Sequence, residues 1–161
     1  MGMAMIMASL KGSVTAVKLL LENGADANGA TVGAGVKALL VAAIYGHTQV
    51  GRVLVENGAD VDMRDTDTDF TPLIIAAAKG HNVFIKMLLE KGARIDLPTR
   101  DGYTALMVAA ASGNIGTVRL LIQSGANVNF RSNCDWTALT YAKKNGHARV
   151  GEILQEAGAV E

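Results

Sequence analysis

Residues 71–93 read TPLIIAAAKGHNVFIKMLLEKGA and contain two apolar segments, each followed by a glycine. The first segment ends at Gly80, and the second has apolar residues at the spacing of one helix face before it ends at Gly92. A glycine directly after a helix readily adopts the left-handed conformation that closes many helices. The stretch therefore predicts two short helices joined by a tight turn.

The same two glycines recur along the whole chain. A Gly-Ala dipeptide begins at positions 24, 58, 92, 125 and 158, and a second glycine series stands at positions 12, 46, 80, 113 and 146. Both series have intervals of 34, 34, 33 and 33 residues. Two glycine series with one period indicate a repeat protein of five units, in which about twelve polar, turn-rich residues connect one unit to the next.

The repeated unit resembles the ankyrin repeat, a helix–turn–helix unit of about 33 residues with a TPLH-x-A signature. The resemblance rests on TPLIIAAAKGH (71–81), DGYTALMVAAASGN (101–114) and the endings LLLENGADAN and LLIQSGANVN, and it covers essentially the whole chain. The histidine position of the signature holds Leu40, Ile74, Met107 and Thr140. The resemblance implies an all-α fold: an ankyrin-type helix–turn–helix repeat solenoid of about five stacked repeats, with β-hairpin-like connectors.

We expect a single ankyrin-repeat domain over residues 1–161. Its repeats are predicted at 1–30, 31–64, 65–98, 99–131 and 132–161, with an incomplete first repeat and a C-terminal capping repeat. Lys143 and Gln155 replace residues that are apolar in the other repeats, as a cap with a polar outer face requires. In the first repeat, rich in methionine at Met3, Met5 and Met7, either the chain is cut from a longer one, which we prefer, or the methionines face a partner.

Composition bounds the class of function. Fifteen basic and fifteen acidic residues cancel, which favours neither nucleic acid nor an anionic membrane as a partner. The apolar runs are shorter than the roughly 18 residues that a membrane-spanning helix needs. The first residues lack the basic region and cleavage site of a signal peptide. The single cysteine, Cys134, cannot form an intramolecular disulfide, so we expect an intracellular, cytoplasmic protein. We also expect the protein to be a monomer.

The acidic stretch DTDTDFTP at residues 65–72 resembles the start of a calcium-binding loop. Such a loop needs glycine at its sixth position and glutamate at its twelfth, and counting from Asp65 these positions hold Phe70 and Ala76. The repeat register predicts instead a connector tip, one residue longer than in the next two repeats. Asp69 takes the turn position held by Gly35 and Gly102, and aspartate tolerates the left-handed conformation. We therefore predict no metal site.

Two other features resemble a phosphate loop and a zinc site, but neither has the residues that such a site needs. The stretch GATVGAGVK at residues 29–37 lacks the Gly-Lys-Ser/Thr order of a phosphate loop, because Val36 intervenes and Ala38 follows Lys37. Each histidine follows a helix-ending glycine, so we interpret these histidines as polar residues that open the second helix of their unit rather than as zinc ligands. They are His47, His81 and His147. No nucleophile–base pair is brought together by the repeat, which predicts no enzyme activity and no cofactor.

Aromatic residues give the strongest indication of a binding surface. The residue before the signature threonine is Val36, Phe70, Tyr103 and Trp136 in successive units, so three rings share one position in the repeat and should form a ladder. Aromatic side chains are enriched in interface hot spots, although each ring could instead only pack on its neighbouring connector. The candidate partner-binding residues are Val36, Tyr45, Asp67, Phe70, Lys79, Arg100, Asp101, Tyr103, Ser112, Asn133, Trp136, Lys144 and Asn145.

The sequence therefore predicts a non-catalytic scaffold for protein–protein interaction. The ankyrin resemblance implies that a loop or extended segment of another protein binds a concave face formed by hairpin tips and first helices. An alternative is a targeting or regulatory ankyrin arm of a larger enzyme or secreted effector whose catalytic part is not in this chain. A third possibility is a purely structural or engineered array, which the degenerate signatures disfavour.

Overall fold

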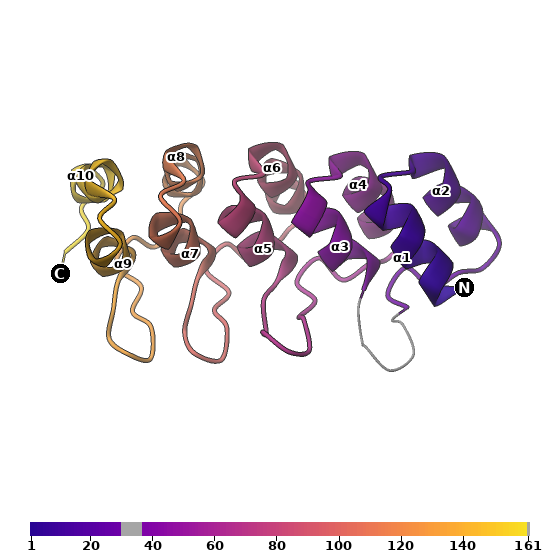
Figure 1. The fold of residues 1–161 in the computed structure, drawn as a ribbon, viewed down its shortest axis with the longest axis horizontal. Coiled ribbons are helices and arrows are strands. Elements are labelled where there is room, and N and C mark those ends of the chain that lie inside the picture. Colours follow the sequence, from indigo (N-terminus) through magenta and orange to yellow (C-terminus); the bar gives the residue numbers. More distant parts are fainter. Residues whose placement is uncertain (30–36, 161) are drawn as a thin grey trace. The chain divides into compact units, whose positions relative to one another are not determined.

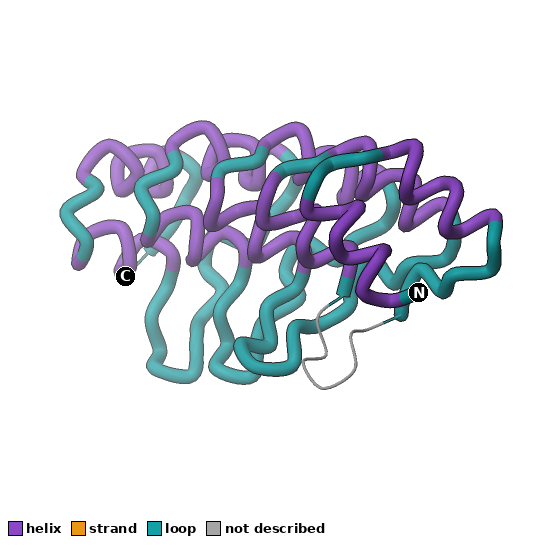
Figure 2. Tube along the Cα trace, turned by 45° about the vertical axis from the view of Figure 1, so that its right-hand side comes forward, coloured by secondary structure: helices purple, strands orange, loops and turns teal. Residues whose placement is uncertain are grey.

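The computed structural model describes residues 1–29 and 37–160, so the predictions for Val36 and for most of the Gly29–Lys37 stretch lie outside the described residues. The described residues form ten helices (Figure 1). They are α1 (Gly2–Leu10), α2 (Val14–Glu22), α3 (Ala38–Tyr45), α4 (Thr48–Glu56), α5 (Pro72–Lys79), α6 (Asn82–Glu90), α7 (Ala105–Ala111), α8 (Ile115–Gln123), α9 (Ala138–Lys144) and α10 (Ala148–Glu156). Within those residues the connectors are loops without regular strands (Figure 2).

The helix ends follow the predicted glycine pattern. Gly46 closes α3 with a φ of 70°, and its amide donates to Ala42 within that helix. The signature threonines begin their helices: the Thr104 and Thr137 hydroxyls accept hydrogen bonds from the amides of Met107 and Thr140. These caps satisfy amide groups that have no partner inside the helix.

The chain divides into two compact units, residues 1–72 with 83–93 and residues 73–82 with 94–161, and each is described by itself. In the first unit α1 lies beside α3, and α2 lies beside α4. Phe84 of α6 is fully buried against α4, where a Cβ on Gly51 would lie 2.7 Å from the Phe84 ring. Two ion pairs on the surface also join α4 to the end of α6 and the residue after it, Arg52 with Glu90 at 3.4 Å and Glu56 with Lys91 at 2.8 Å.

In the second unit α7 packs against α9, and α8 packs beside α10. Side chains that begin the second helices bond to the preceding repeat. Asn114 Nδ2 donates to the carbonyl oxygens of Ala77 and Ala78, and His147 Nε2 lies 3.0 Å from the Ala111 oxygen. His47 makes the equivalent bond in the first unit, 3.2 Å from the Leu10 oxygen. His47 and His147 stand at the N-caps of α4 and α10, as predicted, and they also join neighbouring helix pairs.

The two ends of the repeat series expose different chemistry. Lys143 and Gln155 are exposed, whereas the alanines equivalent to Lys143 are buried at positions 43, 77 and 110. At the other end Leu19 is 59% exposed, although the equivalent Val53 and Ile153 are 8% and 5% exposed. Met3 and Met7 are exposed as well. The repeat boundaries, the single domain and the role of the last repeat as a cap stay predictions.

Candidate functional site

The connectors form short hairpin-like turns that project on the side of the first helices. In the second unit the Thr99 amide donates to Tyr103 O at 3.0 Å, and the Ser132 amide donates to Trp136 O at 2.9 Å. Figure 1 shows the connector before α9 extending from the α9 side, away from α10. The candidate aromatic residues therefore stand at the base of each connector, directly before a first helix.

Adjacent connector tips of the second unit bond to each other. The Asn133 amide donates to Asp101 O at 3.0 Å, and Asn133 Nδ2 donates to Arg100 O at 2.8 Å. Gly102 makes this approach possible, because a Cβ there would lie 2.8 Å from the Asn133 nitrogen and its φ is 83°. Three of the candidate residues, Arg100, Asp101 and Asn133, are thus held together in one fixed arrangement.

At the base of the same connectors, three rings form what we call the aromatic cluster, Tyr103, Trp136 and Tyr141. The Tyr141 ring lies edge-on to both others, with centroid distances of 5.7 Å to Tyr103 and 5.2 Å to Trp136. All three side chains are half-buried. The ammonium group of Lys144 lies over the Trp136 ring, 4.0 Å from its centroid. Edge-to-face pairs and a cation over a ring face are both favourable arrangements.

Tyr141 was not among the candidate residues from the sequence. Its position in the repeat holds Val41, Ile75 and Val108 in other units, so a large ring in place of an aliphatic side chain was the available signal. Burial raises the pKa of the Tyr141 hydroxyl, which lies 3.4 Å from Ser132 Oγ. The ring therefore stays neutral around physiological pH and connects the other two rings.

The remaining candidates are distributed over both units. Tyr45 at the end of α3 is 52% exposed and stacks on His47, with ring centroids 6.0 Å apart. In the first unit Asp67 is exposed and Phe70 is half-buried. In the second unit Lys79, Ser112 and Asn145 are exposed, and the Asn145 side chain donates to Ala111 O at 2.7 Å.

The acidic tip at residues 65–69 binds its carboxylates internally. Asp65 accepts hydrogen bonds from the Thr68 amide, the Thr68 hydroxyl and the Asp67 amide. Asp69 has a φ of 61°, which confirms the predicted left-handed turn position, and it pairs with Arg64 at 2.7 Å. Asp135 adopts the same conformation at the equivalent position, with a φ of 62°. Within residues 1–29 and 37–160, no three His, Cys, Asp or Glu side chains are grouped as a metal site would require.

The Asp65 carboxylate makes a pH-dependent contribution to stability. Burial raises its pKa, but the three hydrogen bonds from Thr68 and Asp67 outweigh burial and lower it. A lowered pKa in the folded state stabilises the fold above the unfolded value of about 3.9, and this contribution is lost as the pH falls through the folded value. We expect Asp65→Asn to be less stable than wild type at neutral pH in urea unfolding, and the difference in stability to shrink as the pH falls below about 3.9.

Asp67→Asn is the control for Asp65→Asn, because it removes an exposed carboxylate from the same tip. A stability difference for Asp65→Asn that persisted unchanged at acid pH would contradict the assignment of this effect to the carboxylate.

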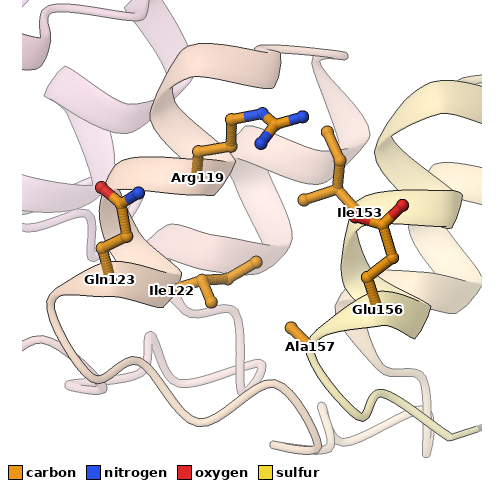
Figure 3. A pocket seen from close by; sticks show the side chains of 6 residues that line it. All are labelled: Arg119, Ile122, Gln123, Ile153, Glu156 and Ala157. Carbon is orange, nitrogen blue, oxygen red and sulfur yellow. The ribbon is translucent and has the colours of Figure 1, made fainter.

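The second helices form shallow grooves rather than a specific site. Figure 3 shows one such groove, where Arg119 and Ile122 of α8 point toward Ile153 of α10. The groove is lined by Arg119, Ile122, Gln123, Ile153, Glu156 and Ala157. Repeat-equivalent residues line a groove between α2 and α4 in the first unit, namely Lys18, Leu21, Glu22, Val53, Glu56 and Asn57. Because the groove recurs at equivalent positions, it follows from the packing of neighbouring second helices.

These features define a class of protein, a helical repeat protein in which paired helices stack and hairpin-like connectors present variable side chains. The family model for ankyrin repeats, described as three copies, matches residues 4–99, 61–132 and 96–160. The chain therefore belongs to the ankyrin repeat family, and the predicted fold class is confirmed. Ankyrin repeats generally mediate protein–protein interaction, and the family is typically non-catalytic.

A search of curated proteins found no match to this sequence. In the part of the chain that the structure describes, no helix has the length and apolar character needed to cross a membrane.

Proposed function

We propose that this chain is a non-catalytic scaffold that binds another protein through its inner surface, defined as the connectors and first helices. The observation that best supports this is the aromatic cluster with Lys144. Tyr103 and Trp136 both contact Tyr141, and all three rings remain half-buried at the base of the connectors. Partly exposed aromatic rings in a fixed arrangement are typical of interface hot spots.

The geometry also favours a loop or an extended segment as the bound part of the partner. The connector tips are fixed by the bonds from Asn133 to Arg100 and Asp101, and the rings hold one another in place. A surface that is ordered before binding loses little conformational entropy when the partner arrives. The rings lie directly beside these tips in sequence, so one extended segment could contact both.

The test compares inner and outer apolar residues in a matched pair of double variants. We expect Tyr103→Ala with Trp136→Ala to weaken the affinity for a natural partner at least about tenfold, because two hot-spot rings are removed. Val83→Ala with Ile115→Ala removes two exposed apolar side chains from second helices, and should change affinity less than about twofold. Affinity would be measured by calorimetry, with circular dichroism to verify that both variants fold.

Equal losses of affinity in the two double variants would contradict binding through the inner surface. An unchanged affinity in the Tyr103→Ala and Trp136→Ala variant would assign the aromatic cluster to packing alone.

A further inference from the structure

We propose that the aromatic cluster and Lys144 together recognise an acidic extended segment of a partner protein. One apolar side chain of that segment would rest on the rings, and a neighbouring carboxylate would bind the Lys144 ammonium. This proposal rests on the proposed function above and specifies the chemistry of the partner. Its basis is the combination of rings and an uncompensated cation in one place.

The cation is available to a partner. Lys144 is exposed, its contact is the Trp136 ring face, and no carboxylate of the described residues pairs with it. Two other cations of the same unit do have carboxylate partners: Arg131 pairs with Asp135 at 3.2 Å, and Arg149 pairs with Glu152 at 2.6 Å. A lysine ammonium has three N–H donors, so contact with one ring face leaves donors for an incoming carboxylate.

The rings hold the cation in a defined place. A cation over an exposed tryptophan face is stabilised only modestly, and this interaction does not neutralise the charge. It does reduce the number of positions that a long lysine side chain samples, which lowers the entropic cost of pairing with a partner's carboxylate. A hydrogen bond between two charged groups is about twice as strong as one between neutral groups.

Two acidic residues of the neighbouring connectors, Asp101 and Asp135, do not neutralise the Lys144 ammonium. Asp135 is already paired with Arg131. Asp101 stands at a connector tip, where its backbone oxygen binds Asn133, whereas the rings stand at the connector base. Lys144 is the charged group that contacts a ring of the cluster, and complementarity favours a negatively charged group in the partner at this point.

An acidic protein segment fits this surface better than nucleic acid does. Nucleic-acid affinity depends on many lysine and arginine contacts to phosphates. This chain has fifteen basic and fifteen acidic residues, and the proposed site supplies one free cation beside the rings. A single cation with three rings matches one carboxylate and one apolar side chain.

The experiment uses the whole chain and its single tryptophan as the probe. A random peptide library would be selected on the immobilised protein, and enriched peptides would be synthesised together with versions in which each Asp or Glu is replaced by Asn or Gln. Because Trp136 is the only tryptophan, its fluorescence reports binding at the rings directly. We expect enriched peptides to contain acidic residues beside an apolar one, and their amide versions to bind about tenfold more weakly.

Variants of the cation make the test specific. Lys144→Gln is expected to weaken binding of the acidic peptide by about tenfold, with no further loss when the amide peptide is used, because both changes remove the same pair. Lys144→Arg should retain binding, and Lys86→Gln on α6 is the matched control, an exposed lysine of a second helix. Thermal unfolding of each variant verifies that stability is unchanged.

Several outcomes would overturn the proposal. Enriched peptides that are neutral or basic, independent effects of Lys144→Gln and of the amide peptide, or tighter binding of a single-stranded oligonucleotide would each do so. If peptide binding needs Tyr103 and Trp136 but ignores Lys144, the proposed function survives and the acidic partner does not. If no peptide is enriched, the proposed function of the inner surface fails as well.

Discussion

Replacing Phe84 with alanine is expected to lower the free energy of unfolding by about 3–5 kcal/mol, among the largest effects of any single substitution in the chain. Phe84 is fully buried, and its ring rests on the backbone of α4 at Gly51. Because Gly51 has no side chain, α4 itself offers no atoms to fill the space that the ring leaves. A cavity that cannot collapse adds its own cost to the lost burial of the ring.

The neighbouring residue supplies the control. Val83 is 70% exposed, so Val83→Ala should change stability by less than about 0.5 kcal/mol. Chemical unfolding followed by circular dichroism measures both variants under the same conditions. A loss below about 1 kcal/mol for Phe84→Ala would show that the ring is not packed as described.

Gly51→Ala tests the same contact from the opposite side. In wild type a Cβ at Gly51 would lie 2.7 Å from Phe84 and 2.9 Å from Met87, and overpacking of this kind costs about 1–3 kcal/mol. In the Phe84→Ala background that contact with the ring is absent, while alanine still gains up to about 1 kcal/mol over glycine in a helix. The substitution is therefore expected to stabilise the Phe84→Ala variant although it does not stabilise wild type.

The fold could be predicted from the sequence because its main signals are local. A glycine that closes a helix needs a positive φ, and this requirement depends on the backbone of that residue alone. The same reasoning correctly placed Asp69 in the left-handed conformation, because the register aligned it with Gly102. The longer tip at residues 65–70 was also correct, since the Asp65–Phe70 backbone bond spans one residue more than the Thr99–Tyr103 bond.

The site could be predicted only in part. The register placed Tyr103 and Trp136 at equivalent positions, but it did not show that both rings contact Tyr141 of α9. These contacts depend on how far the Tyr141 side chain extends from α9 toward the connectors, which a local sequence pattern does not predict. The repeat register also placed Lys144 at the surface. Its position over the Trp136 ring follows from three-dimensional packing, which the register does not show. The contributions of these residues to binding remain predictions.

The histidines show how one residue can satisfy a local pattern and also hold two repeats together. His147 follows a helix-ending glycine, which the sequence shows, and it bonds to Ala111 of the preceding repeat, which the sequence does not show. The ring reaches that oxygen by passing close to Gly113, where a Cβ would lie 2.7 Å from it. Gly113 is therefore needed both for its positive φ of 71° and for the space it leaves.

Gly113→Ala is accordingly expected to lower the free energy of unfolding by about 2–5 kcal/mol, the sum of left-handed strain and overpacking. Gly146→Ala is the matched control. Gly146 has a φ of 75°, but a Cβ there would meet no atom within 4 Å. It should cost only the strain, about 1–2 kcal/mol. Urea unfolding of the two variants separates the effect of conformation from the effect of space.

A double-variant cycle of Gly113→Ala with His147→Ala tests whether the clash with the His147 ring causes the extra loss of stability. Removing the ring by His147→Ala loses the bond to Ala111 and costs stability in wild type. In the Gly113→Ala background the same change also removes the clash, so it should cost less, with a coupling of about 1 kcal/mol or more. Additive effects would place the Gly113→Ala cost in the backbone alone, and the two glycine variants would then be equally destabilised. A coupling between the two substitutions would mean that the left-handed glycine and the inter-repeat hydrogen bond of His147 depend on the same small space.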